Sequence, residues 1–118
     1  ATQDVMMQTL KILTDFSSTP GPRYKTEGPF SGEQFREEIL YPKLLDAIEN
    51  DLKLVVDLDG VQGYGTSFLE EAFGGLIRND GLEYDTVMKY IDIISVEEPY
   101  LKDDIMEYLQ AADNENKE

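Results

Sequence analysis

The feature that most constrains the fold is a short apolar run in the middle of the chain. Residues 53–58 are Lys-Leu-Val-Val-Asp-Leu, and the next two residues, Asp59 and Gly60, form a turn signal. An apolar run that is this short and rich in β-branched residues is typical of a buried strand. The run therefore predicts a strand at the centre of a sheet.

Two other segments have strand patterns. Leu10, Ile12 and Phe16 lie on one side of an extended chain over residues 10–16, which predicts the first strand. Residues 91–95, Ile-Asp-Ile-Ile-Ser, predict the third strand. Residues 17–22 carry two prolines around a glycine and cannot form regular structure.

Helical patterns alternate with these strands. Ser31 is a predicted N-cap, because Gln34 three residues later completes a capping box. Pro42 interrupts the helix that follows, so we expect a kink, or two helices over 32–40 and 42–50. We expect one short helical turn at residues 85–90, and a last helix that begins near Pro99.

The helix after the central strand is expected to begin with Thr66 or Ser67 as its N-cap. This helix contains Gly74 and Gly75, and glycine inside a helix costs about 1 kcal/mol relative to alanine. We expect that the two glycines allow the helix to approach the sheet closely.

The predicted order is strand, helix, strand, helix, strand, helix. This βαβαβα alternation predicts an α/β fold with a small, mainly parallel sheet and packed helices. The length of 118 residues fits one domain, which we place at residues 1–112, and the polar residues 113–118 are expected to form a frayed tail.

The composition excludes several kinds of chemistry. The sequence contains no cysteine and no histidine, so it offers no thiolate, no imidazole base and no serine–histidine triad. We expect no enzymatic activity, no catalytic residues, no metal site and no cofactor. The formal charge of −15 disfavours nucleic acid and anionic membranes, and it favours a basic protein partner. The start Ala1-Thr2-Gln3-Asp4 does not resemble a signal peptide, and we expect a cytoplasmic protein.

The loop after the central strand admits three interpretations. Gly60 and Gly65 have the spacing of a P-loop, but Thr66 occupies the position of its lysine. Asp57 and Asp59 could hold magnesium, although aspartates at a strand end more often cap a turn. Thr66 and Ser67 are candidate phosphorylation sites at a helix start, or plain capping residues.

Residues 57–68 resemble the central segment of STAS domains, the anti-sigma-factor antagonist modules. The pattern of that family is a strand ending in Asp-Leu-Ser-Gly-Val, a short loop, Asp-Ser-Ser-Gly and a helix. In that family a partner kinase phosphorylates the serine after the aspartate, and phosphorylation releases the partner. The resemblance places the phosphoacceptor at Thr66, beside Ser67. Gly65 stands where the family has its aspartate, and Phe68 where it has its glycine.

The chain is more similar still to the STAS-like domain of unknown function, a small bacterial family. Three runs carry this likeness, at residues 16–24, 28–36 and 64–76, with the sequences FSSTPGPRY, GPFSGEQFR and YGTSFLEEAFGGL. This resemblance implies the STAS-like fold and no particular activity.

These observations favour a protein-interaction module in bacterial signalling, regulated by phosphorylation. The partner would be an ATPase-type kinase or an anti-sigma-like regulator with a basic patch. The predicted surface combines the phosphorylation candidates with five flanking residues, namely Arg23, Tyr24, Gly63, Tyr64 and Gly65. One alternative is a small-ligand or nucleotide-binding domain that uses the helix N-terminus at 66–67 as an anion site. Another is a homodimerising subunit, which would need an exposed apolar patch.

Overall fold

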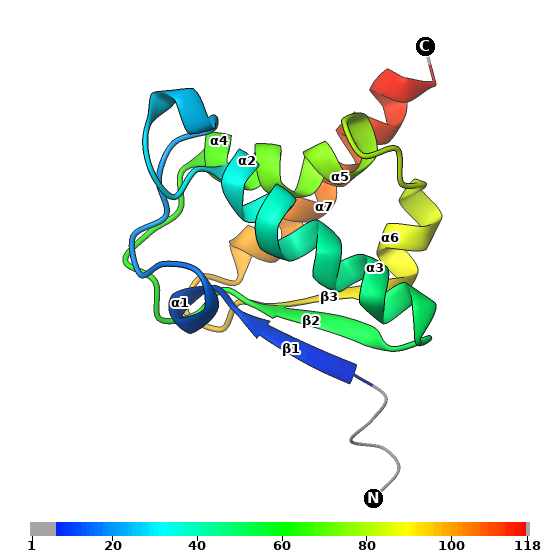
Figure 1. Ribbon diagram of the computed structural model, residues 1–118, viewed down its shortest axis with the longest axis horizontal. Helices are drawn as coiled ribbons and strands as arrows, with labels where there is room; N and C mark the ends of the chain where they lie inside the picture. The colour runs from blue at the N-terminus through cyan, green and yellow to red at the C-terminus, as the bar shows by residue number, and fades with distance from the viewer. Residues whose placement is uncertain (1–6, 118) are drawn as a thin grey trace, which may run out of the picture.

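The computed structural model describes residues 7–117 of the chain, and Ala1–Asp4 and Glu118 lie outside the described residues. Three strands form one sheet in the order β1 (Met7–Lys11), β2 (Lys53–Asp57) and β3 (Ile91–Ile94). Both pairings are parallel. The predicted α/β class, the parallel sheet and the central position of β2 are confirmed (Figure 1).

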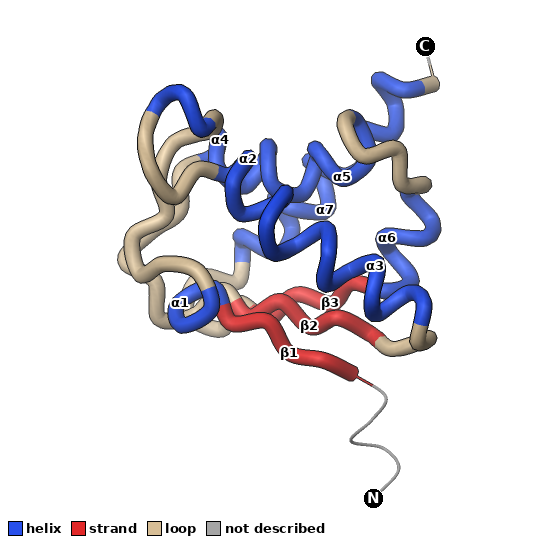
Figure 2. Tube along the Cα trace, viewed as in Figure 1, coloured by secondary structure: helices blue, strands red, loops and turns tan. Residues whose placement is uncertain are grey.

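The crossover helices and the C-terminal helix lie on one side of this sheet, and the short helix at residues 12–15 lies beyond the carboxyl end of the first strand (Figures 1 and 2). The physical reason is the strand order. Two right-handed crossovers that step across a sheet in the same direction place their helices on the same face. The helical segments are α1 (Ile12–Asp15), η2 (Lys25–Glu27), α2 (Gly32–Phe35), η3 (Arg36–Leu40), α3 (Tyr41–Glu49), α4 (Thr66–Leu69), η4 (Glu70–Gly74), α5 (Gly75–Arg78), α6 (Tyr84–Tyr90) and α7 (Tyr100–Asn116).

The core lies between the sheet and these helices. Alternate strand residues point into it, and the cluster that they form with the helices includes Leu10, Leu54, Val56, Ile91 and Ile93. Phenylalanine rings complete the core at the carboxyl end of the sheet, where the ring centroids of Phe35 and Phe68 are 5.8 Å apart. This aromatic contact joins the start of the first crossover helix to the start of the second.

The first strand differs from its predicted position. β1 ends at Lys11, and residues 12–15 form the short helix α1 instead of continuing the strand. The carboxylate of Asp15 accepts a hydrogen bond of 2.8 Å from the backbone N–H of Lys11 and so closes this turn. Ile12 and Leu10 are both fully buried. The apolar alternation therefore reflects burial of a strand end followed by a helical turn.

Pro42 does not divide its helix in two. Residues 32–49 form one continuous helix, and its turn before the proline, η3, is a π-helical turn. The N–H of Tyr41 donates to the carbonyl of Arg36, five residues back. This wider turn removes the clash that a proline ring makes with the carbonyl one α-turn earlier. The predicted interruption is thus a local widening.

The predicted N-cap of α2 is confirmed, but the C-terminal residues differ from the prediction. Ser31 is the N-cap of α2, and its hydroxyl accepts a hydrogen bond of 2.9 Å from the N–H of Gln34. The tail is helical rather than frayed up to Asn116, where α7 ends. The side-chain amide of Asn116 donates to the carbonyl of Ile77 at 2.9 Å, which ties the end of α7 to α5. None of the helices in residues 7–117 is long and apolar enough to cross a membrane.

The two crossover helices are in direct backbone contact at Gly32. A Cβ atom added there would lie 2.5 Å from the carbonyl oxygen of Phe68, which is a rigid backbone atom. We predict that Gly32→Ala lowers the free energy of unfolding by about 1–3 kcal/mol, because the helices must move apart. Gly63→Ala is the control, since a Cβ there would meet nothing within 4 Å. Urea denaturation of both variants checks this, and equal stabilities would contradict it.

Candidate functional site

Two distant parts of the chain meet in one surface cavity. Arg23 and Tyr24 belong to the loop after α1, and Ser67 is the second residue of α4. Together with Pro22 and Glu27 they line a cavity of about 330 Å³. The structure therefore brings together three of the residues that the sequence analysis singled out. Thr66 precedes Ser67 in the sequence, but it does not line the cavity.

Backbone hydrogen bonds fix the loop that carries Arg23. The N–H of Gly21 donates to the carbonyl of Phe30 at 2.8 Å. The first two N–H groups of α2 also donate to this loop. The N–H of Gly32 donates to the carbonyl of Pro22 at 2.8 Å, and the N–H of Glu33 donates to the carbonyl of Arg23 at 3.0 Å. The loop is thus anchored on the N-terminus of this helix, and the N–H groups of Gly32 and Glu33 are not free to bind a ligand.

The N-terminus of α4 is different. Gly65 is its N-cap, with no capping side chain, so the prediction that Thr66 or Ser67 caps this helix is wrong. Both hydroxyl residues are exposed and occupy the first two helical positions. Among the residues that the structure describes, none accepts a hydrogen bond from the N–H groups of Thr66, Ser67 or Phe68. Side-chain hydroxyls and unpaired backbone donors therefore lie together at this helix start.

The loop before α4 has one anchor and two open glycines. The hydroxyl of Tyr64 donates to the carbonyl of Leu58 at 2.8 Å, and its ring packs against Phe68. Burial and the nearby carboxylates raise the pKa of Tyr64 well above its ordinary value. Tyr64 thus holds the loop in place. Gly63 and Gly65 are exposed, and a Cβ at either would meet nothing within 4 Å.

The aspartates after β2 are turn residues. A carboxylate oxygen of Asp57 accepts a hydrogen bond of 2.9 Å from the N–H of Asp59, and the Asp59 carboxylate accepts from Val96 and Glu97 at 3.1 and 3.0 Å. The turn interpretation is therefore confirmed. The N–H of Gly60 donates to the carboxylate of Glu97 at 2.7 Å. A P-loop needs such N–H groups for phosphate, so this loop does not have the geometry of one.

Beside the cavity, all three arginines of the chain meet the adjacent residues Glu70 and Glu71. Arg23 and Arg78 both contact the Glu70 carboxylate, and the Arg78 contact measures 2.6 Å. Arg36 is 2% exposed, contacts Glu71 at 2.8 Å and binds the Asp80 carboxylate through two hydrogen bonds of 3.0 and 3.1 Å. We call this group the arginine–glutamate cluster. It consists of Arg23, Arg36, Glu70, Glu71, Arg78 and Asp80.

Charge pairing dominates the ionisation of this cluster. Burial alone would lower the pKa of Arg36, but hydrogen bonds to Glu71 and Asp80 outweigh it and raise the pKa. Burial would raise the pKa of Glu70, but hydrogen bonds from Arg78 and Arg23 outweigh it and lower the pKa. Arg36 and Glu70 are therefore held in their ionised forms by their partners.

Gly75 makes room for this cluster. A Cβ at Gly75 would lie 2.4 Å from Nε of Arg36, and one at Gly74 would lie 2.8 Å from the Glu70 carboxylate. The expectation that the glycine pair brings the helix close to the sheet is wrong. Gly75 instead leaves room for the buried guanidinium of Arg36 from the neighbouring helix, and Gly74 leaves room for the Glu70 carboxylate.

A comparison with protein families gives one match. Residues 31–101, more than half of the chain, match the STAS-like domain of unknown function (DUF4325). The chain belongs to this family. No curated protein and no solved structure is significantly similar to it.

The matched part of the STAS-like domain includes β2, the loop after it, α4 and most of the arginine–glutamate cluster. Arg23 and Tyr24 precede it, so this likeness covers only one wall of the cavity. The sequence analysis missed Arg36, Arg78 and Asp80. The one sequence signal was the position of Glu71 among the apolar residues of its helix, because a buried carboxylate must be paired with a cation.

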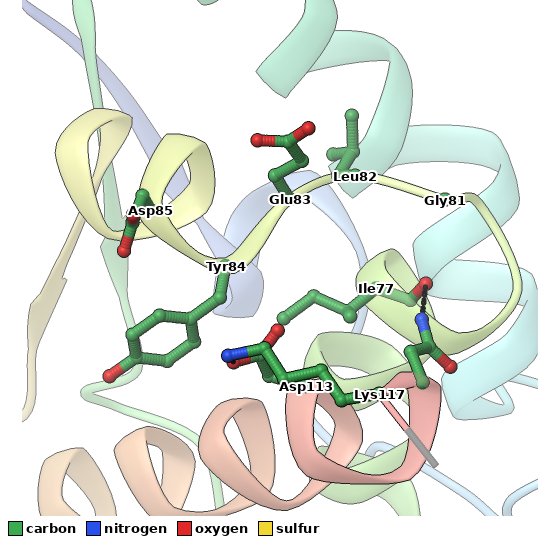
Figure 3. Close-up of a pocket in the computed structure, with 9 residues that line it drawn as sticks. Ile77, Gly81, Leu82, Glu83, Tyr84, Asp85, Asp113 and Lys117 are labelled. Carbon is green, nitrogen blue, oxygen red and sulfur yellow. Dashed lines mark hydrogen bonds and ion pairs between the residues drawn. The ribbon is translucent and has the colours of Figure 1, made fainter.

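A second cavity of about 330 Å³ lies at the other end of the STAS-like domain (Figure 3). It lies between the loop after α5 and the end of α7, and the side chain of Tyr84 extends along it. Lys117 pairs with Asp113 at 3.1 Å across one turn of α7. None of the residues singled out from the sequence lines this cavity, so we place the candidate site at the cavity beside Ser67.

The buried pairing of Arg36 predicts a large stability effect. Arg36→Met removes the cation that pairs with Asp80 and leaves Glu71 with only its longer contacts to Arg78 and Arg23, at 3.6 and 3.8 Å. We expect the free energy of unfolding to fall by about 3–5 kcal/mol. Lys25→Met, which breaks an exposed pair with Glu37, is the control and should cause no measurable change. Chemical denaturation of both variants checks this. Similar losses in the two variants would contradict the importance of the cluster.

The lowered pKa of Glu70 predicts a pH dependence. A carboxylate whose folded-state pKa lies below its ordinary value of 4.5 stabilises the fold above that pH. This contribution is lost as the pH falls from 4.5 through the lowered pKa. The stability difference between the wild type and Glu70→Gln should therefore be largest near neutral pH and shrink below 4.5. Urea titrations over this range measure it, and a difference that stays constant with pH would contradict it.

Proposed function

We propose that this STAS-like domain is a non-enzymatic protein-interaction module of bacterial signalling, acting in the cytoplasm and switched by phosphorylation at the start of α4. The observation that carries the proposal is the cavity that joins Ser67 to Arg23 and Tyr24. Arginine and tyrosine are frequent in the parts of interfaces that contribute most to binding. An exposed hydroxyl beside them puts a modifiable group at the edge of such a surface.

The loop at residues 60–65, which precedes α4, has features that suit it to the same interaction surface. Packing within the domain does not require glycine at positions 63 and 65, since a Cβ would fit at either position. A backbone without side chains permits close approach by another molecule. Tyr64 keeps this loop in one conformation, which reduces the entropy lost on binding. The partner surface thus comprises the loop 60–65, the start of α4 and the loop at Arg23.

A phosphate at Ser67 would find favourable surroundings. The unpaired N–H groups at the start of α4 and the positive end of the helix dipole both stabilise an anion. Arg23, which lines the same cavity, supplies a guanidinium that Glu70 already holds in place. The added charge of about −2 would weaken binding to a partner that carries carboxylates or apolar groups there. The partner class we propose is an ATPase-type kinase or an anti-sigma-like regulator, whose basic patch binds the acidic surface of the domain. The part of the partner that contacts Ser67 itself would be acidic or apolar, so that phosphate there weakens the complex.

Small-ligand binding is a second candidate function. The unpaired N–H groups of α4 beside a cavity favour an anionic ligand such as a nucleotide. Two observations count against tight binding, because Glu27 also lines the cavity and Arg23 is already paired with Glu70. Calorimetric titration with nucleotides tests this alternative directly.

Binding to the native partner should depend on the charge at the start of α4. We predict that the variant carrying both Thr66→Asp and Ser67→Asp loses a partner that the wild-type chain retains in a pull-down from the source organism. Thr14→Asp, an exposed threonine outside the site, is the matched control and should retain it. Mass spectrometry of the native protein should find phosphate on Ser67 or Thr66.

Two results would overturn this proposal. One is equal recovery of the partner by the wild type and the doubly substituted variant, together with unmodified Thr66 and Ser67 in the native protein. The other is the absence of any specific protein partner combined with nucleotide binding by calorimetry, which would favour the small-ligand function.

A further inference from the structure

One face of the sheet is left uncovered by the described elements. The crossover helices and α7 lie on the opposite side, and α1 lies beyond the carboxyl end of β1, as Figure 2 shows. Sheets made only of parallel strands are normally covered on both faces. We call this uncovered surface the outer face. Strand alternation and register assign to it Met7, Thr9, Lys11, Lys53, Val55, Asp57, Asp92 and Ile94.

The outer face is partly apolar. Met7 is 53% exposed and Ile94 is 37% exposed, while Val55 at its centre is only 6% exposed. Val55 is not part of the cluster that forms the core, and its register places it between Thr9 and Asp92 on the outer face. An apolar centre with exposed apolar residues around it is typical of a surface that another molecule covers.

The charge of the outer face differs from that of the chain. It carries two lysines and two aspartates, Lys11, Lys53, Asp57 and Asp92, whereas the whole chain has a net charge of −15. A basic partner would be attracted to the acidic remainder of the surface rather than to this balanced face. Two copies of an acidic chain repel each other, and a neutral face is where they can meet at the lowest electrostatic cost.

We propose that a second copy of this chain covers the outer face, so that two sheets pack face to face in a symmetric dimer. Two-fold symmetry allows two arrangements about Val55. With the strands of the two copies antiparallel, Lys53 of each copy lies opposite Asp57 of the other. With the strands parallel, Lys53 meets Lys53 and Asp57 meets Asp57. Charge complementarity therefore selects the antiparallel arrangement.

The same arrangement places Asp92 near its own symmetry mate. Each Asp92 already has a cation within its own chain, because Lys102 of α7 lies 3.8 Å from its carboxylate. That pairing reduces the repulsion between the two aspartates. Thr9 also lies on the symmetry axis and faces Thr9 of the other copy. The dimer does not use Arg23, Thr66 or Ser67, so it does not rest on the proposed phosphorylation switch.

Charge-swap variants test the dimer. Sedimentation velocity of the 118-residue chain should show a concentration-dependent monomer–dimer equilibrium. Lys53→Asp should raise the dissociation constant of the dimer at least about tenfold, because the new aspartate of each copy then lies opposite Asp57 of the other. In the double variant K53D/D57K the charges of both pairs are exchanged, so opposite charges again face each other and dimerisation should recover. Thermal unfolding of each variant verifies that the monomer is folded, since D57K also removes the acceptor for the Asp59 N–H.

Cross-linking gives a second, independent measurement. The chain has no cysteine, so Thr9→Cys introduces a single thiol on the axis of the proposed dimer. A short bismaleimide should join two T9C chains. It should not join chains of the control Leu45→Cys, whose thiol would lie on α3 at an exposed position on the helical side of the sheet. A wild type that stays monomeric up to about 1 mM would overturn the proposal. A dimer that is insensitive to K53D and cross-links equally at both positions would also overturn it.

Discussion

The pairing of three arginines with Glu70 and Glu71 is the interaction on which the rest of the structure depends. It joins the first crossover helix through Arg36 and the second through both glutamates. It also joins the loop beside the cavity through Arg23. Ion pairs of this kind stabilise a fold only when every member is paired, because a single unpaired buried charge is costly. In residues 7–117, no buried side-chain polar atom lacks a hydrogen-bond partner.

Both π-helical turns found in residues 7–117 occur where this cluster forms. η3 begins at Arg36, and η4 begins at Glu70 and includes Glu71. A π-turn shifts the side chains after it around the helix, because one extra residue is accommodated in the turn. In η3 the cause is local, since Pro42 requires a wider turn before it. The widened turns and the glycine at position 75 together give the guanidinium of Arg36 a place between the helices.

Much of the fold could be predicted from the sequence, because local patterns determine it. The β-branched run at 53–58 indicated the central strand, and Ser31 with Gln34 indicated a helix start. The end of β1 could not be predicted, since Ile12 is buried equally well in a strand or a helical turn. The roles of Gly32 and Gly75 depend on contacts with residues 36 and 39 positions away in the sequence. No local pattern specifies such contacts.

In the candidate site, too, local sequence identified the residues but long-range contacts determine how they meet. Thr66, Ser67, Arg23 and Tyr24 could be chosen from residue type and resemblance, but only the folded chain brings Ser67 and Arg23 to one cavity. Arg23 belongs to both the site and the cluster, because the carboxylate that positions it, Glu70, is also bound by Arg78. A phosphate at Ser67 would compete with Glu70 for Arg23, and Arg78 would still neutralise Glu70 if Arg23 moved. The second arginine therefore lets Arg23 exchange partners without leaving an unpaired carboxylate, which a phosphorylation switch at this position requires.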